Sequence, residues 1–264
     1  MHHSLYETLR ITSEDGIDVL TLCRPHKLNA VSITMAEELN TYFVGLQRER
    51  SVRVVIICGE GKHFCAGFDL EDVPHITRNT EEALRLQRVM ADIVLNMRRC
   101  PQPVIALMHG AACGAGFAIA LAADVRYAAD DACMNVAMSR IGLTGCDMGI
   151  SYFLPRAVGI SNAAELMMTG RFADAALALR TGIVSQVMPR GALTAAGAAL
   201  AREMTSMSPE GLRLTKDGLN ASQATSSLEA VVALEDRAQV ICIQRYMKEG
   251  VAAFLEKRTP KYAP

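Results

Sequence analysis

The sequence predicts an α/β protein in which a covered, mainly parallel sheet is followed by a helical C-terminal part. Short apolar runs of strand length lie at residues 52–58 and 104–108, and continuous apolar character is typical of strands buried on both faces. Each run leads into a glycine-bearing turn and the start of a helix, whereas the pattern after about residue 160 is almost wholly helical. Strand–turn–helix units followed by helices indicate a covered sheet with an appended helical region.

The N-terminal elements can be assigned from turn and capping signals. Residues 5–12 and 17–22 are predicted strands, and Asp15-Gly16 between them is typical of a hairpin turn. Thr34 and Glu37 form a capping-box pattern, which predicts a helix that begins there and ends near residue 48. The first apolar run, 52–58, follows as a buried strand.

The rest of the chain contains a long helix, short strands and then helices. Residues 80–99 are a predicted helix, because prolines at 101 and 103 would end it. After the second apolar run, Asp124 and Arg126 suggest an ion pair or a cap at the end of a helix. The further elements that the pattern predicts are short strands at 125–128, 133–138 and 184–188 and helices at 149–158, 162–169, 173–181, 191–207, 209–220 and 227–254. We divide the chain into a core of residues 1–200 and a helical region of residues 201–264.

Composition excludes several classes of protein. The chain has 264 residues and a formal net charge of −1, so it lacks the basic character of a nucleic-acid-binding protein. None of its apolar runs is long enough for a membrane span, and its start has no apolar signal core, so we expect a cytoplasmic protein. Its eight cysteines include no C-x-x-C pair, which favours free thiols over disulfides or a metal site.

The most informative stretch is residues 108–127. A strand ends at Met108, a turn of small residues follows, and a helix with almost no polar face runs on to Asp124. Small residues at a helix start let a ligand approach the backbone, and the first N–H groups of a helix are free to bind a negative oxygen. The alternative is that Gly114, Ala115 and Gly116 only allow close packing of the helix on the sheet.

A second turn of the same kind makes the ligand interpretation stronger. Residues 59–70 again combine a strand end, glycines and a helix start near Asp69. Two such turns could each direct one backbone N–H at the same carbonyl oxygen, which is the arrangement of an oxyanion hole.

The order and spacing of several motifs resemble the crotonase superfamily, the enoyl-CoA hydratase/isomerase proteins. The motifs that carry the resemblance are Arg24-Pro25 with Leu28-Asn29-Ala30, then Phe64 to Leu70, His109-Gly110 with Gly114-Ala115-Gly116 and Asp124, Leu154 to Gly159, and Phe254 to Pro260. The resemblance implies a crotonase-like ββα spiral core, an acyl-CoA-binding unit, with a helical C-terminal trimerisation region. It also implies a homotrimer or a dimer of trimers, a coenzyme A thioester as the substrate, and no separate cofactor.

The resemblance also assigns candidate site residues by motif position. The backbone N–H groups of Phe68 and Ala115 would hold the thioester oxygen. Residues near the adenine and pantetheine would be Ala66, Asp69 and Leu70. Lys27 and Lys257 are candidates for phosphate contacts, although either could equally be a solvated surface lysine, and Asp69 fits a helix N-cap.

Two departures from the family pattern bear on the reaction. Hydratases of this family use two glutamates, and the matching positions here are Ala118 and Met138, which cannot move protons. One carboxylate remains nearby, Asp147. Other branches of the family carry a catalytic aspartate in this segment, whereas the alternative is that Asp147 caps the helix that begins near Gly149.

We therefore expect an enzyme of the enoyl-CoA hydratase/isomerase family. Asp147 would transfer the proton while the two N–H groups stabilise a thioester enolate, with hydration, isomerisation and thioester hydrolysis left open. The alternative is a catalytically silent acyl-CoA-binding or scaffolding paralogue, which would have no need of Asp147.

Overall fold

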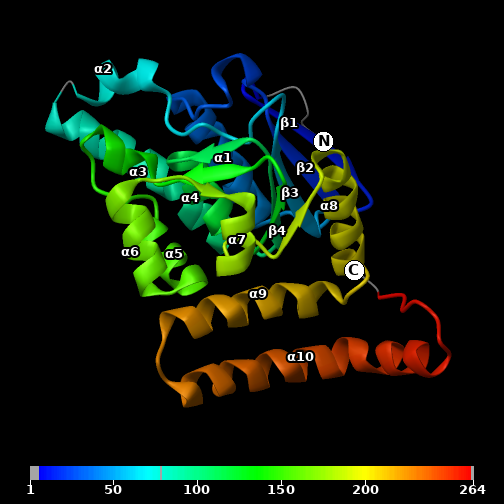
Figure 1. The fold of residues 1–264 in the computed structure, drawn as a ribbon. Helices are drawn as coiled ribbons and strands as arrows, with labels where there is room; N and C mark the ends of the chain where they lie inside the picture. The colour runs from blue at the N-terminus through cyan, green and yellow to red at the C-terminus, as the bar shows by residue number, and fades with distance from the viewer. Residues whose placement is uncertain (1–5, 78, 263–264) are drawn as a thin grey trace.

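A computed structural model describes residues 6–77 and 79–262, and it has two sheets and a C-terminal helical hairpin that projects from the core (Figure 1). The larger sheet has the order β1-β2-β3-β4-β6-β9, antiparallel between β1 and β2 and parallel elsewhere. The smaller sheet has the order β5-β7-β8. The strands are β1 (Leu9–Glu14), β2 (Ile17–Leu22), β3 (Val54–Gly59), β4 (Val104–Met108), β5 (Ala111–Cys113), β6 (Val125–Ala129), β7 (Cys133–Asn135), β8 (Ala173–Asp174) and β9 (Gln186–Met188).

Most of the helices pack around the two sheets, and the last two form the C-terminal hairpin. The helices are η1 (Pro25–Lys27), α1 (Ile33–Leu46), η2 (Leu70–Asp72), α2 (Val73–Ile76), α3 (Thr80–Arg99), α4 (Ala115–Ala122), η3 (Ala137–Ile141), α5 (Ile150–Val158), α6 (Ile160–Thr169), α7 (Ala175–Thr181), α8 (Arg190–Thr205), α9 (Pro209–Ala224) and α10 (Leu228–Leu255). None of these helices is long and apolar enough to cross a membrane, as far as the described residues show.

The central strands β3 and β4 of the larger sheet are buried on both faces, as their apolar runs predict. In β3, Val55 and Ile57 point into the main core, whereas Val54 and Ile56 point to a second core beneath α8. The hairpin of β1 and β2 turns at Asp15 and Gly16 with positive φ angles of 49° and 78°, the geometry that its sequence predicts.

Two predicted boundaries were wrong. Helix α1 begins at Ile33, two residues before the helix start that the Thr34–Glu37 pattern implies, because the Ser32 hydroxyl accepts the Met35 N–H at 3.2 Å. The strand predicted over 133–138 ends at Asn135, where the chain turns into η3.

A buried lysine attaches α9 to the core. The side chain of Lys216 is 3% exposed, and its Nζ lies 3.0 Å from an Asp124 carboxylate oxygen. Asp124 also pairs with Arg98 at 2.7 Å. Arg126 donates to the carbonyls at the end of α4, which is the cap of the two predicted alternatives and not the ion pair with Asp124. A lysine is tolerated at this depth because its charge is paired and hydrogen-bonded.

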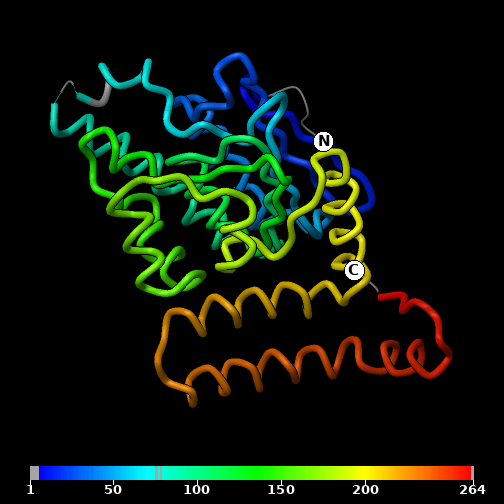
Figure 2. Tube along the Cα trace, in the orientation of Figure 1, coloured from blue at the N-terminus to red at the C-terminus, as the bar shows by residue number. Residues whose placement is uncertain are grey.

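Helix α10 packs mainly against α9 and lies on the side of α9 that faces away from the sheets (Figure 2). Helix α8 passes through the predicted domain boundary at residue 200 and ends at Thr205, with Ala201 buried in the core beneath it. The hairpin that departs from the core therefore begins at Pro209.

Candidate functional site

The two glycine-bearing turns lie against each other. Cys65 forms an isolated parallel bridge with Ala112, in which the Cys65 N–H donates to the Ala111 carbonyl at 3.0 Å and the Cys113 N–H donates to the Cys65 carbonyl at 2.9 Å. Phe68 forms a second bridge with Val31. Backbone hydrogen bonds therefore fix the positions of both turns relative to one another.

Glycines allow this close approach. Gly67 has a φ of 114°, and a Cβ added to it would lie 3.2 Å from the Cys113 carbonyl oxygen and 3.9 Å from the Ala115 nitrogen. At Gly116 the crowding is greater, because a Cβ there would lie only 2.4 Å from the Cys65 carbonyl oxygen. A side chain at either position would separate the turns.

The Phe68 and Ala115 N–H groups have no hydrogen-bond acceptor among the described residues, although backbone groups beside them are paired. Asp69 N–H donates to the Val31 carbonyl at 3.0 Å, and Ala118 N–H donates to the Gly114 carbonyl at 3.0 Å. Ala115 is the first residue of α4 and follows Gly114, which has a φ of 50° and supplies no side-chain cap. A helix start without a cap leaves its first N–H groups available to an anionic oxygen.

Asp147 lies on the loop between η3 and α5 and is partly exposed, less buried than its apolar surroundings in the sequence suggest. Its Oδ1 accepts the Met148 N–H at 2.7 Å and a side-chain N–H of Gln87 in α3. The helix-cap interpretation is not supported, because Gly149 is the N-cap of α5 and no side chain caps that helix.

The elements around Asp147 pack against the helix that begins at Ala115. Helix α4 packs against α3 and α5, and Gly114 lies against Ala137 of η3. The residues at the two positions expected for glutamates, Ala118 and Met138, are both buried in the main core. These two side chains contribute apolar surface and no titratable group.

The residues predicted to contact adenine and pantetheine lie together beside Phe68. Ala66 is half-buried, Leu70 is exposed and Asp69 is buried. Asp69 accepts the Glu71 N–H at 3.1 Å, as expected of an N-cap, and forms an ion pair with Arg24 at 2.8 Å. Burial alone would raise the pKa of Asp69, but the hydrogen bonds from Arg24 and the Glu71 N–H outweigh it and lower that pKa below its usual value.

The two candidate phosphate ligands lie far apart in the chain's own fold. Lys27 is part of η1, and its ammonium pairs with the exposed Glu71. Lys257 follows α10, the outer helix of the C-terminal hairpin (Figure 1). No contact in the described part of the chain joins these two lysines.

Two thiols in the turns are unsuited to nucleophilic chemistry. Burial raises the pKa of Cys65 to about 12 and that of Cys113 to about 12, so both stay protonated near neutral pH. Within the described ranges, no group of three or more His, Cys, Asp or Glu side chains is arranged to hold a metal ion.

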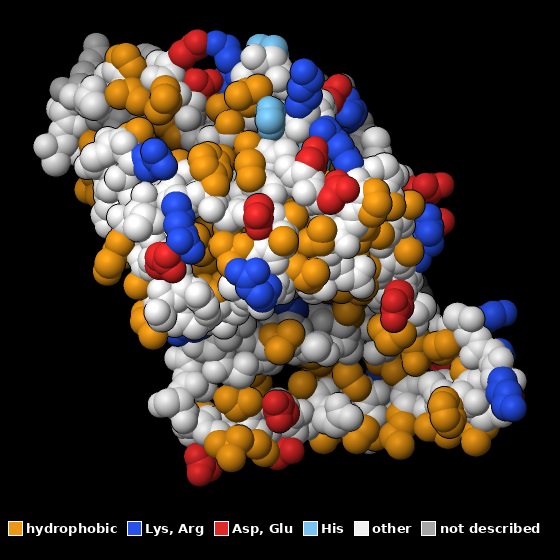
Figure 3. Space-filling model, in the orientation of Figure 1, with side chains coloured by type: hydrophobic (Ala, Val, Ile, Leu, Met, Phe, Trp, Pro, Cys, Tyr) orange, Lys and Arg blue, Asp and Glu red, His pale blue; other side chains and the backbone are white. Residues whose placement is uncertain are grey.

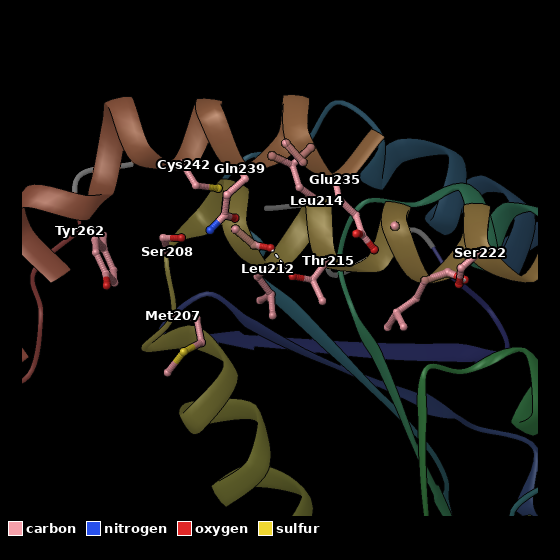
Figure 4. A pocket seen from close by; sticks show the side chains of 14 residues that line it. Met207, Ser208, Leu212, Leu214, Thr215, Ser222, Glu235, Gln239, Cys242 and Tyr262 are labelled. Atoms are coloured by element: carbon pink, nitrogen blue, oxygen red, sulfur yellow. Dashed lines mark hydrogen bonds between the residues drawn. The ribbon is translucent and has the colours of Figure 1, made fainter. Parts of the chain in front are cut away.

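A cavity of about 660 Å³ lies elsewhere, between α9 and α10 (Figure 4). Its lining includes Leu212 and Thr215 of α9, Gln239 and Cys242 of α10, and Tyr262 at one end. It contains none of the predicted site residues, so its size does not make it the candidate active site.

Sequence reasoning missed two functional candidates, Gln87 and Arg24. Gln87 contacts Asp147 across 60 residues of sequence, and no local pattern signals such a contact. Arg24 belongs to a motif that carried the family resemblance, but its pairing with Asp69 is evident only in the fold.

Similarity to known proteins covers almost the whole chain. A family model described as enoyl-CoA hydratase/isomerase matches residues 12–264. The probable enoyl-CoA hydratase EchA12 of Mycobacterium tuberculosis is 38% identical over 250 residues, covering 92% of this chain and 88% of the relative. The 1,2-epoxyphenylacetyl-CoA isomerase of Escherichia coli is 32% identical over 252 residues, covering 94% and 95%.

Solved structures give the same result for the fold. The crystal structure of an enoyl-CoA hydratase from Bacillus anthracis has a TM-score of 0.92 and 30% sequence identity, covering 97% of this chain and 99% of that one. The predicted crotonase-like architecture with a helical C-terminal region is therefore confirmed.

Proposed function

The chain belongs to the enoyl-CoA hydratase/isomerase family and is an enzyme of that family, and from this premise we propose that it moves a proton on an acyl-CoA thioester. The single observation that carries the proposal is the pair of unpartnered N–H groups at Phe68 and Ala115, on turns held together by backbone hydrogen bonds. Coenzyme A enters as part of the substrate, and the reaction needs no separate cofactor.

The two N–H groups would bind the thioester oxygen. Removal of a proton from the carbon next to the thioester carbonyl drives an electron pair toward that oxygen, and the thioester becomes an enolate. Preorganised donors are most effective where charge develops, and removing one donor typically costs about 100- to 1,000-fold in kcat. Ala115 suits this role because its N–H is at the first position of α4, where a Cβ is tolerated.

Asp147 would be the proton-transfer group. Between Ala115 and Ile150 the other aspartates are Asp124, which is paired with Arg98 and Lys216, and two residues at the turn between β6 and β7. Asp147 would take the proton from one carbon and return it to another, so that the double bond moves and no atom is gained or lost.

Isomerisation fits these residues better than hydration. Water addition as the family performs it uses two glutamates, and Ala118 and Met138 stand at the matching positions. A single carboxylate is sufficient to shuttle one proton between two carbons. The relatives support both reactions by name, since one is called an isomerase and another a hydratase.

Coenzyme A recognition would use the residues beside Phe68 and a lysine from another subunit. Ala66, Asp69 and Leu70 would line the adenine and pantetheine site, and Lys27 would contact phosphate. Helix α10 exposes apolar side chains along its length (Figure 3), which supports assembly into a trimer or a dimer of trimers. In such an assembly Lys257 would reach a neighbouring chain's ligand.

A thioester panel tests the proposal. The purified protein is incubated with saturated, 2-enoyl and 3-enoyl CoA thioesters, and products are followed by retention time and mass. A shift in retention without a change in mass is expected, and it should be lost in Asp147→Asn. A gain of one water would mean hydration, release of coenzyme A would mean hydrolysis, and an unchanged panel with a thioester still bound would mean a silent paralogue.

A further inference from the structure

We propose that Gln87 is a positioning residue that fixes the orientation of the Asp147 carboxylate and leaves one defined oxygen to carry the proton. The proposal rests on the proton-transfer role of Asp147 proposed above. It assigns a function to a side chain on α3 that belongs to none of the motifs recognised in the sequence.

Both hydrogen bonds to the Asp147 carboxylate end on the same oxygen. The Met148 N–H donates to Oδ1 at 2.7 Å, and the Gln87 side-chain amide donates to Oδ1 as well. In the described part of the chain no group donates to Oδ2. The lone pairs of Oδ2 are therefore free, and this oxygen is the one that would accept the substrate proton.

Two donors are needed to define the orientation. The Met148 N–H follows Asp147 directly in the chain, so it moves with the loop and does not fix the loop against the rest of the protein. Gln87 comes from α3, whose neighbouring side chains Leu86 and Met90 are buried in the core. The Gln87 amide thus ties the carboxylate to a rigid helix that also packs against α4.

An amide is well suited to this task. A lysine or arginine in place of Gln87 would also orient the carboxylate, but its positive charge would favour the ionised form and weaken Asp147 as a base. A neutral N–H donor holds Oδ1 without adding charge. The hydrogen bond is still charge-assisted on the carboxylate side, so it is stronger than one between neutral groups.

The position of Gln87 makes the proposal testable without unfolding the protein. Gln87 is exposed, so Gln87→Met keeps the length of the side chain, removes the N–H donor and leaves the core untouched. Gln47→Met is the matched control, because Gln47 is also exposed, at the C-cap of α1, and has no side-chain hydrogen bond among the described residues. Rates are measured on trans-3-hexenoyl-CoA, with thermal midpoints for each variant.

We expect Gln87→Met to lower kcat about tenfold, as for the loss of a hydrogen bond to a charged group, with KM changed less than twofold. Gln47→Met should match the wild type, and all thermal midpoints should agree. In single-turnover experiments with enzyme in excess, Gln87→Met should add no further loss to Asp147→Asn, because both act through one carboxylate.

Distinct outcomes would overturn the two proposals. A wild-type kcat for Gln87→Met beside an inactive Asp147→Asn would refute the positioning role alone. An equal loss in both backgrounds would also refute it, since Gln87 would then act elsewhere. Full activity of Asp147→Asn would refute the proposed function and the positioning role together.

Discussion

The contact between the two turns predicts that Gly116→Ala strongly lowers activity through the backbone. Gly116 lies in the first turn of α4 and has no side chain that could touch a substrate. Its effect on the enzyme would come only from the distance between α4 and the turn that carries Phe68. The substitution therefore tests whether that distance matters.

The size of the disturbance follows from the geometry. An added Cβ would lie 2.4 Å from the Cys65 carbonyl oxygen and 2.8 Å from the Cys65 Sγ. Carbon–oxygen contacts are normally no shorter than about 3.3 Å, so the turns must separate by roughly 0.9 Å. Overpacking of this kind costs about 1–3 kcal/mol of stability. A misplacement of about 1 Å at a reacting centre can cost about 100-fold in rate.

The assay compares Gly116→Ala with Gly45→Ala in α1. A Cβ at Gly45 would meet nothing within 4 Å, so this control should gain up to about 1 kcal/mol of stability and keep its activity. Gly116→Ala should remain folded with a lowered thermal midpoint and lose about 100-fold in kcat/KM. A folded Gly116→Ala variant with the wild-type rate would refute the role assigned to the pair of turns.

Three further predictions concern stability and thiol reactivity. The pKa of Asp69 is lowered in the folded protein, so ionised Asp69 stabilises the fold above its unfolded pKa, and this stabilisation is lost as the pH falls through its folded pKa. Asp69→Asn should therefore lower the free energy of unfolding by about 3 kcal/mol at pH 7. Chemical denaturation from pH 7 to pH 3 should show that the difference in unfolding free energy between the variant and the wild type becomes smaller. Lys216→Met leaves Asp124 with one cation fewer and loosens α9, so the thermal midpoint should fall; an unchanged midpoint would contradict the attachment described for α9. Burial raises the pKa of Cys65 to about 12, so this thiol should be unreactive at pH 8. Iodoacetamide at pH 8 should modify the exposed Cys146 first and should leave Cys65 unmodified until the protein unfolds. Peptide mass mapping would identify the modified cysteines.

Local signals in the sequence were reliable where one interaction dominates. The Asp15-Gly16 turn, the doubly buried β3 and the apolar helix α4 all follow from residue type and burial within a few neighbouring positions. The start of α1 was predicted wrongly because two capping patterns overlap, and Ser32 rather than Thr34 has the extended backbone that an N-cap needs.

Contacts between distant segments could not be predicted in the same way. The resemblance to a family placed Phe68 and Ala115 on paired turns, but nothing local indicates that Gln87 meets Asp147 or that Lys216 meets Asp124. These partners are chosen by helix packing, which depends on the whole fold.

Proton exchange from solvent tests the central claim most directly. Wild-type protein is incubated in D2O with trans-3-hexenoyl-CoA, and the thioester is analysed by mass spectrometry alongside Asp147→Asn. The proposed enolate predicts deuterium in the recovered thioester with the wild type and almost none with Asp147→Asn, at equal ligand affinity. Equal deuterium uptake by both proteins would contradict the assignment of Asp147. If the wild type gave neither deuterium uptake nor a shifted double bond on any enoyl-CoA, that result would contradict enolate chemistry in this enzyme.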